Sequence, residues 1–266
     1  MPHYYRGMAI IHNPTIDTLL NRRTIRQWTD QALSADEIET IETAAQRAAT
    51  SQFLNAWSAI RITDKDIALK LASIGNQPYV AQAGALYIFI IDNHRNVRIA
   101  REAGIDDADM TFDSDYTFTQ GQNDAVLALH AMETAAESLG LGTVILGCIL
   151  NDSRAVIDTL HLPEYTVPVL GLAIGHPAQE PTLKPRMPRE LQFFNNVYPD
   201  DSTTPNITEA LADFDNAVSH YYDLRFPDQP VHAFTEQVVA QSTDTARLKK
   251  SFGKPARAQG FTGRSF

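Results

Sequence analysis

Hydrophobic residues recur at two spacings along the chain, and each spacing predicts a different element. The clearest helix follows Ser34-Ala35-Asp36-Glu37. This motif has the form of a capping box, in which the serine hydroxyl and the glutamate each satisfy a free backbone amide at the helix start. Apolar residues then recur three and four positions apart, at Ile38, Ile41, Ala44, Ala45 and Ala48. That period places them on one helical face, so we expect an amphipathic helix directly after Ser34.

Along the rest of the chain the pattern alternates helices with short strands. Asn13 and Pro14 suit the cap and the first turn of a helix over Thr15–Asn21. The other predicted elements are strands over Trp57–Ile62, Ala85–Ile91, Thr143–Leu146 and Val167–Ile174, and helices over Asp64–Ile74 and Ile207–Tyr221. Because every residue of Ala85–Ile91 is apolar, we expect that strand to be buried on both faces. This order of elements predicts an α+β or α/β fold.

One predicted helix, Ala125–Leu139, is apolar around nearly its whole circumference. A helix of that kind is buried on all sides, either in the core of one protomer or between two subunits. From Gly175 to Pro205 the chain is rich in proline, so we expect an extended arm over the surface. Because one core would join the strands on either side of the apolar helix, we expect a single domain over residues 1–266, with the arm at about 175–205 and a C-terminal extension.

The bulk composition narrows the class of protein. With 22 Lys and Arg against 32 Asp and Glu, the 266-residue chain has a formal net charge of -10. This balance argues against a nucleic-acid partner, because a polyanion needs a broad basic face. A single cysteine, Cys148, excludes an intrachain disulfide and paired-cysteine zinc sites, and the eight histidines show no metal-ligand spacing. The longest apolar run is far shorter than a membrane span, so we expect a cytoplasmic protein without a membrane or metal partner.

Two short basic clusters interrupt this acidic background, Arg22-Arg23-Thr24-Ile25-Arg26 and Lys184-Pro185-Arg186. Arginine forks match pairs of phosphate oxygens and lysine adds a mobile positive charge. The two clusters would therefore form a phosphate clamp if they converge. Arg22 and Arg23 also follow a predicted helix, where basic residues stabilise the C-terminus, and this alternative stays open.

Other motifs predict less chemistry. Gly140-Leu141-Gly142 followed by Gly147 lacks the G-x-G-x-x-G spacing of a dinucleotide-binding turn. The acidic run from Asp106 to Asp115 lacks the glycine and the terminal glutamate of a calcium loop, so we interpret it as part of a solvated loop over Gly104–Gly121. Cys148 has no neighbouring histidine to activate it, which argues against a catalytic thiolate.

The first basic cluster opens a longer series of motifs that resembles one family. Arg23-Thr24-Ile25-Arg26-Gln27-Trp28-Thr29-Asp30 is similar to the opening motif of the FMN-dependent nitroreductases. Further motifs follow in the order of that family's NADPH-preferring branch, the oxygen-insensitive nitroreductases and NADPH-flavin reductases: Phe53-Leu54-Asn55, Arg61 to Lys65, Gln77 with Val80 to Ala83, Ala135 to Gly142, Pro168 to Leu172, and Leu183 to Arg186. The resemblance runs from about Ile16 to Arg186, and the last 80 residues match poorly.

The resemblance implies an α+β fold with a mixed sheet flanked by helices, assembled as an interlocked homodimer with an FMN at each interface. Carried over by position, the FMN-binding residues would be Arg22, Arg23, Thr24, Ile25, Arg26, Thr50, Gln77, Ile145, Leu146, Gly147, Cys148, Lys184, Pro185 and Arg186. Phe53 and Asn55 would line the substrate pocket. Cys148 replaces a glycine of the family's flavin loop, so we expect its side chain to narrow the pocket or to alter the backbone there.

The implied activity is that of an oxidoreductase that passes a hydride from NADPH through flavin N5 to nitroaromatics, quinones or flavins by a ping-pong mechanism. Because the flavin carries the chemistry, we expect no catalytic acid or base. Two alternatives stay open: a flavin-binding sensor or store without turnover, and a dedicated flavin reductase that releases FMN. The preference for NADPH over NADH also stays open, because that branch recognises NADPH through arginines in the poorly matched end. Candidates there are Arg247, Lys249, Lys250 and Arg257, and a solvated basic tail is the open alternative.

Overall fold

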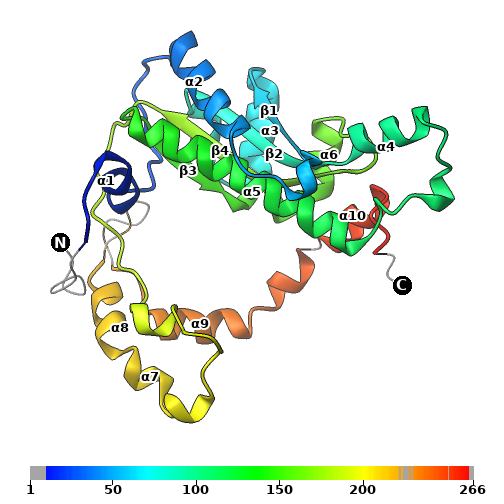
Figure 1. Ribbon diagram of the computed structural model, residues 1–266. Coiled ribbons are helices and arrows are strands. Elements are labelled where there is room, and N and C mark those ends of the chain that lie inside the picture. The colour runs from blue at the N-terminus through cyan, green and yellow to red at the C-terminus, as the bar shows by residue number, and fades with distance from the viewer. Residues whose placement is uncertain (1–9, 222, 224–227, 229, 251, 264–266) are drawn as a thin grey trace. The chain divides into compact units, whose positions relative to one another are not determined.

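The chain divides into two compact units. A computed structural model (Figure 1) describes residues 10–221, 223, 228, 230–250 and 252–263, without the side chains of Leu248 and Lys249. The larger unit spans residues 17–180 together with 248–266, and the smaller unit spans 1–16 together with 181–247. A single domain over the whole chain therefore stays a prediction.

The larger unit is built on one four-stranded sheet. Its strands are β1 (Trp57–Ile62), β2 (Ala85–Asp92), β3 (Gly142–Leu146) and β4 (Thr166–Gly175). They lie in the order β1-β2-β4-β3. All four strands form where the apolar runs predicted them, within one residue at each end.

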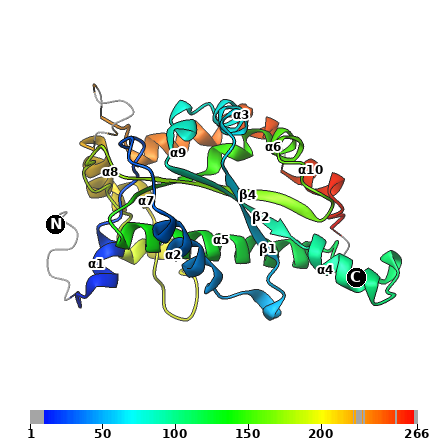
Figure 2. The ribbon, with the colours of Figure 1, turned by 90° about the horizontal axis from the view of Figure 1, so that it is seen from above.

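Strand β2 is buried on both faces, as its unbroken apolar sequence predicted. Its side chains at odd positions, from Ala85 to Ile91, pack with helices α2 (Ala35–Gln46), α5 (Asp115–Ser138) and α10 (Gly253–Ala258). The side chains at even positions, from Leu86 to Ile90, pack with helices α3 (Lys65–Gly75) and α6 (Ser153–Thr159). Figure 2 shows α2 and α5 on one side of the sheet and α3 and α6 on the other. The expected α+β class is confirmed.

The expected mixed sheet needs a correction, because every neighbouring pair of named strands is antiparallel. Parallel pairing within the described residues is limited to one isolated bridge between Thr24 and Thr143. The stretch after helix α1 (Pro14–Leu20) runs beside β3 there. It pairs at too few positions to count as a fifth strand.

The caps predicted at two helix starts are present, and a third helix start has a cap that was not predicted. In α1, Ile16 N donates to Asn13 Oδ1 at 2.9 Å. At the start of α2, Glu37 N donates to Ser34 Oγ at 3.2 Å and Ser34 N donates to Glu37 Oε2 at 2.7 Å, which completes the capping box. The carboxylate of Asp64 caps α3. Capping therefore fixed these boundaries where the hydrophobic period alone would have left them uncertain.

Helix α5 differs from the prediction at its start and on its surface. It begins at Asp115, capped by Ser114, so the second half of the loop expected over Gly104–Gly121 is helical. The added turns are polar and carry no apolar period, which explains the error. The helix is also not buried on all sides, because Val126 and Leu127 are 37% and 48% exposed. One apolar face of α5 is thus uncovered within the protomer.

Four short helices were not predicted: α4 (His94–Glu102), α6, α9 (Phe234–Ser242) and α10. Each spans fewer than ten residues, and such a segment gives too few apolar repeats to reveal a helical period. No helix among the described residues combines the length and hydrophobicity needed to cross a bilayer.

The smaller unit contains α7 (Ile207–Ala210), α8 (Ala212–Ser219) and α9. The single helix expected over Ile207–Tyr221 is divided at Leu211. Leu211, Phe214 and Val218 form its buried cluster, and the rings of Phe214 and Phe234 lie 5.4 Å apart. From Pro181 to Pro205 the chain forms only short 3-10 turns, as the proline-rich arm predicted.

Candidate functional site

The first basic cluster lies along the β3 edge of the sheet. Ile25 N donates to Thr143 O at 2.8 Å, beside the parallel bridge that joins Thr24 to Thr143. Gly142 makes this approach possible, because a Cβ at that position would lie 2.7 Å from Ile25. The cluster is therefore extended backbone held by the sheet. Its arginines do not form the last turn of a helix, which was the alternative.

An extended segment sends alternate side chains to opposite sides, and this divides the basic cluster. Arg22 reaches α5, where its guanidinium donates to Glu133 Oε1 at 2.6 and 2.8 Å. It also donates to Thr24 Oγ1 at 3.2 Å. Because the Glu133 side chain is only 2% exposed, Arg22 neutralises a buried carboxylate. Because Arg22 is paired with Glu133, it is less available to bind an anion.

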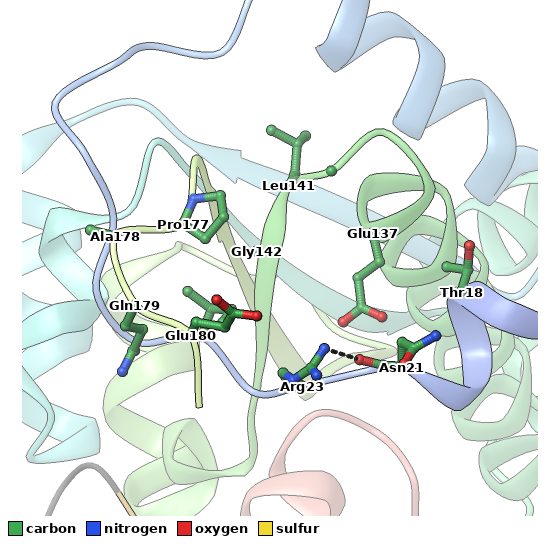
Figure 3. Close-up of a pocket in the computed structure, with 12 residues that line it drawn as sticks. Thr18, Asn21, Arg23, Glu137, Leu141, Gly142, Pro177, Ala178, Gln179 and Glu180 are labelled. Carbon is green, nitrogen blue, oxygen red and sulfur yellow. Dashed lines mark hydrogen bonds between the residues drawn. The ribbon is translucent and has the colours of Figure 1, made fainter. Parts of the chain in front are cut away.

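Arg23 faces a cavity of about 700 Å³ on the other side of the segment (Figure 3). Its Nη1 donates to Asn21 O at 3.1 Å, whereas its Nε is buried and has no hydrogen-bond partner among the described residues. A buried guanidinium donor without a partner is costly. This atom is therefore a strong candidate to bind an anion.

The far wall of the cavity is the chain that follows β4. Pro177, Ala178, Gln179 and Glu180 line it, and Figure 3 shows them across β3 from Arg23. The side chain of Gln179 accepts from the backbone of Arg26 at 2.6 Å, and Ala178 N donates to Gln27 O at 2.9 Å. These bonds tie the two walls together.

Glu137 places a titratable group in the same cavity. Burial is the main cause that raises the pKa of Glu137 to about 7. Nearby Glu133 also raises this pKa, while the hydrogen bond from Thr143 and the charges of Arg22 and His130 lower it. The net charge of the cavity therefore changes near neutral pH.

The predicted flavin loop follows β3. Leu146 is buried, Ile145 and Cys148 are partly exposed, and Gly147 is exposed, with nothing within 4 Å of the position that a Cβ would take at Gly147. The thiol of Cys148 lies against Gly75 at the end of α3, where a Cβ would be 2.8 Å from Sγ. The absence of a side chain at Gly75 thus makes room for the side chain of Cys148, which stands where the family has a glycine. Burial also raises the pKa of Cys148, which disfavours a thiolate.

Gln77 follows Asn76, the C-cap of α3, and its backbone N donates to Ala72 O at 2.9 Å. Its side-chain Oε1 is buried without a hydrogen-bond partner among the described residues. Two of the predicted flavin ligands, Arg23 and Gln77, therefore carry unsatisfied buried polar atoms. The residues present fit a polar, anionic ligand such as FMN.

The remaining predicted residues of the larger unit lie elsewhere. Thr50, Phe53 and Asn55 belong to the connection between α2 and β1, where Phe53 is 86% exposed. Asn55 lines a second cavity of about 530 Å³, whose other lining residues include Trp57, Tyr87 and Arg95. The two cavities share no residue, so these three are not brought to the Arg23 cavity within one protomer.

Lys184, Pro185 and Arg186 belong to the smaller unit. Arg186 is exposed in its extended segment, and its Nη1 donates to the carbonyl oxygens of Lys184 and Pro185 at 3.1 and 3.4 Å. Their convergence with Arg23 stays a prediction. Of the candidates for NADPH recognition, Arg247 donates to Gln241 Oε1 at 2.5 Å, and the side chain of Lys249 lies outside the described residues.

Sequence reasoning missed three acids on α5: Asp124 and Glu133, which are buried, and Glu137, which is partly buried. The signal for Glu133 and Glu137 was present, because carboxylates on an otherwise apolar predicted helix need partners. Asp124 precedes that predicted helix. Among the described residues, no group of three His, Cys, Asp or Glu side chains gathers into a metal site.

Comparison with known proteins gives matches over nearly the whole chain. Residues 19–176 match the model of the nitroreductase family, and residues 184–264 match the model of its C-terminal domain. A Bacillus subtilis protein named FMN reductase (NADPH) is 35% identical over 228 residues, covering 85% of this chain and 90% of the relative. An NADPH-dependent oxidoreductase of Staphylococcus haemolyticus is 33% identical, covering 87% and 92%.

Solved structures agree with these matches. The NfrA1 nitroreductase from B. subtilis superimposes with a TM-score of 0.85 at 32% identity, covering 94% of this chain and 100% of that one. The NADPH:FMN oxidoreductase from Vibrio harveyi, solved in complex with NAD+, gives 0.80 at 27% identity, covering 95% and 100%. The expectation that the resemblance fades after Arg186 is wrong, because the C-terminal model matches to residue 264. Short family motifs are sparse there, whereas a full-length comparison sums many weak similarities.

Proposed function

Because this chain belongs to the nitroreductase family, we propose that it is an NADPH-dependent FMN oxidoreductase that reduces quinones, nitroaromatics or free flavins by a ping-pong mechanism. The observation that carries the proposal is the Arg23 cavity on the β3 edge, with the unsatisfied Nε of Arg23 beside it. Bound FMN supplies the chemistry, as it accepts a hydride and passes two electrons on. The protein binds the flavin, orients it and shields it from solvent.

In this proposal each part of the larger unit has a defined task. Arg23 binds the phosphate from the cavity that it lines, and Arg26, Lys184 and Arg186 stay predicted phosphate ligands. The Oε1 of Gln77 accepts a hydrogen bond from the flavin or its ribityl chain, which would satisfy a buried atom that lacks a partner among the described residues. Gly147 leaves open space beside the loop, so a planar ring system can approach its backbone amides.

We also propose a homodimer. The uncovered apolar residues of α5, Val126 and Leu127, supply a face for it. A dimer also accounts for the distance between the two sets of predicted residues, since a second copy can bring its Phe53 and Asn55 to a cavity that one protomer does not complete. The single cysteine and the acidic composition fit a cytoplasmic location.

Two measurements on the purified protein test this function. We expect flavin absorbance after addition of FMN and desalting, and steady oxidation of NADPH when menadione is supplied. A protein that stays colourless contradicts the proposal. A protein that holds FMN but oxidises no NADPH with any quinone, nitroaromatic or flavin is a flavin sensor or store.

A flavin reductase that releases FMN is the second candidate, favoured by the relative named FMN reductase (NADPH). Dialysis separates it from the first candidate. If FMN is a resident cofactor, the absorbance survives dialysis, whereas a releasing enzyme loses FMN and turns over added FMN. Comparing kcat/KM for NADPH and NADH on the same preparation establishes the donor.

A further inference from the structure

Residues 51–56, which join α2 to β1, are held in an unusual backbone conformation. Gln52, Phe53 and Asn55 have positive φ angles of 50°, 60° and 49°. Asparagine tolerates this left-handed region, but glutamine and phenylalanine rarely adopt it. Three such residues within four positions persist only where the surroundings impose them.

A buried carboxylate imposes the conformation from the neighbouring helix. Asp124 of α5 is 1% exposed, and it accepts hydrogen bonds from Ser51 N at 2.8 Å and from Ala56 N at 3.3 Å. The two bonds hold both ends of the segment. One turn earlier in α5, Gly121 allows the close approach, because a Cβ there would lie 3.1 Å from Ala56 O.

Two side chains of α4 fix the middle of the segment. Arg95 Nη2 donates to Asn55 O at 2.7 Å, and Asn96 Nδ2 donates to Leu54 O at 3.2 Å. With its backbone fixed from two helices, the segment exposes Phe53 to 86% and directs Asn55 toward the 530 Å³ cavity. An exposed aromatic ring on a rigid, strained turn is typical of a contact residue.

We propose that Asp124 is a positioning residue: it holds residues 51–56 so that Phe53 and Asn55 meet the electron acceptor. The role of Phe53 and Asn55 rests on the proposed function, whereas the hold on the backbone does not. Asp124 touches neither flavin nor acceptor. It acts through the two backbone amides that it binds.

The first test measures the backbone without any ligand. In Asp124→Asn one oxygen still accepts, but the amide group opposes the second backbone N–H, so we expect hydrogen exchange of the peptide that contains Ser51 and Ala56 to quicken by about tenfold. Asp115→Asn makes the same substitution at the exposed start of α5 and is the control. Equal exchange in Asp124→Asn and wild type overturns the proposal.

The second test compares two acceptors. Menadione must stack in a pocket, whereas ferricyanide takes electrons without one, so in Asp124→Asn we expect kcat/KM for menadione to fall about tenfold relative to ferricyanide. An equal loss for both acceptors, or an unchanged ratio with faster exchange, refutes the positioning role. If Asp124→Asn does not fold, Arg95→Gln removes the outer hydrogen bond at an exposed site and must shift the ratio in the same direction. Wild-type protein without flavin or turnover refutes the proposed function, while the exchange test still decides the hold on the backbone.

Discussion

At the scale of single residues, the members of the basic cluster have unequal roles. The sequence presented Arg22, Arg23 and Arg26 as equivalent charges. The structure commits Arg22 to Glu133 and leaves a buried donor of Arg23 unsatisfied. Such a difference cannot be predicted from the motif, because it depends on which face of an extended segment meets α5.

We therefore expect Arg23→Gln to weaken FMN binding by about 1–3 kcal/mol, the usual loss for a charged hydrogen-bond partner. Fluorescence titration of the flavin-free protein measures it. Arg98→Gln, at an exposed position of α4, serves as the matched control and should bind FMN as wild type does. An unchanged Kd in Arg23→Gln would remove this residue from the site.

Glu137 predicts a pH dependence of stability. Its pKa is raised to about 7 in the folded protein from an ordinary value of 4.5, so the folded state binds the proton more tightly than the unfolded state. The resulting stabilisation is complete below pH 4.5 and is lost as the pH rises through about 7. We expect the Tm of wild type to fall more than that of Glu137→Gln between pH 5.5 and pH 8. Parallel Tm profiles would show that Glu137 is not the group responsible.

At the scale of elements, the strands and the capped helices were predictable, and the short helices were not. Ser34 with Glu37, and Asp64, fixed helix starts through local hydrogen bonds that the sequence encodes directly. The start of α5 was not predicted, because its first turns are mostly polar. Packing against β2, a contact distant in sequence, explains why such turns are helical, and no local pattern reports it.

Contact between α3 and the flavin loop gives a prediction at this scale. In Gly75→Ala the new methyl group meets Cys148 Sγ at 2.8 Å, so we expect a loss of about 1–2 kcal/mol from overpacking. Cys148→Gly removes the obstacle, and the double variant should recover most of that loss. A double-mutant cycle by urea unfolding measures the coupling. Additive losses would mean that the two positions do not share space.

At the scale of the whole molecule, the uncovered face of α5 is the feature that a single protomer does not explain. We expect Leu127→Glu to lower the mass in solution from twice 29.5 kDa to 29.5 kDa, because a charge in an apolar interface is costly. Light scattering after gel filtration measures the mass. Leu69→Glu, on an exposed position of α3, is the control and should leave it unchanged. A wild-type protein that is already monomeric would refute the dimer.

The family and the fold class could be predicted from the sequence, because ordered motifs identify them. The Arg23 side of the candidate site stays a prediction. The division of the chain into two units and the separation of Asn55 from Arg23 could not be predicted. The order of motifs along a chain does not specify the distances between them in the folded protein. Cavities are formed by residues that only the fold brings together.

The bridge between Thr24 and Thr143 has a consequence for how the protein forms. It joins positions far apart in the chain, and closing so long a loop is entropically expensive until other contacts have shortened it. Because this edge is strand β3, which pairs with β4, we expect β3 and β4 to pair before the Arg23 segment joins the sheet. We therefore expect a refolding chain to form its core first and the Arg23 segment last, so that FMN bound as proposed would stabilise the finished protein and would not guide its folding.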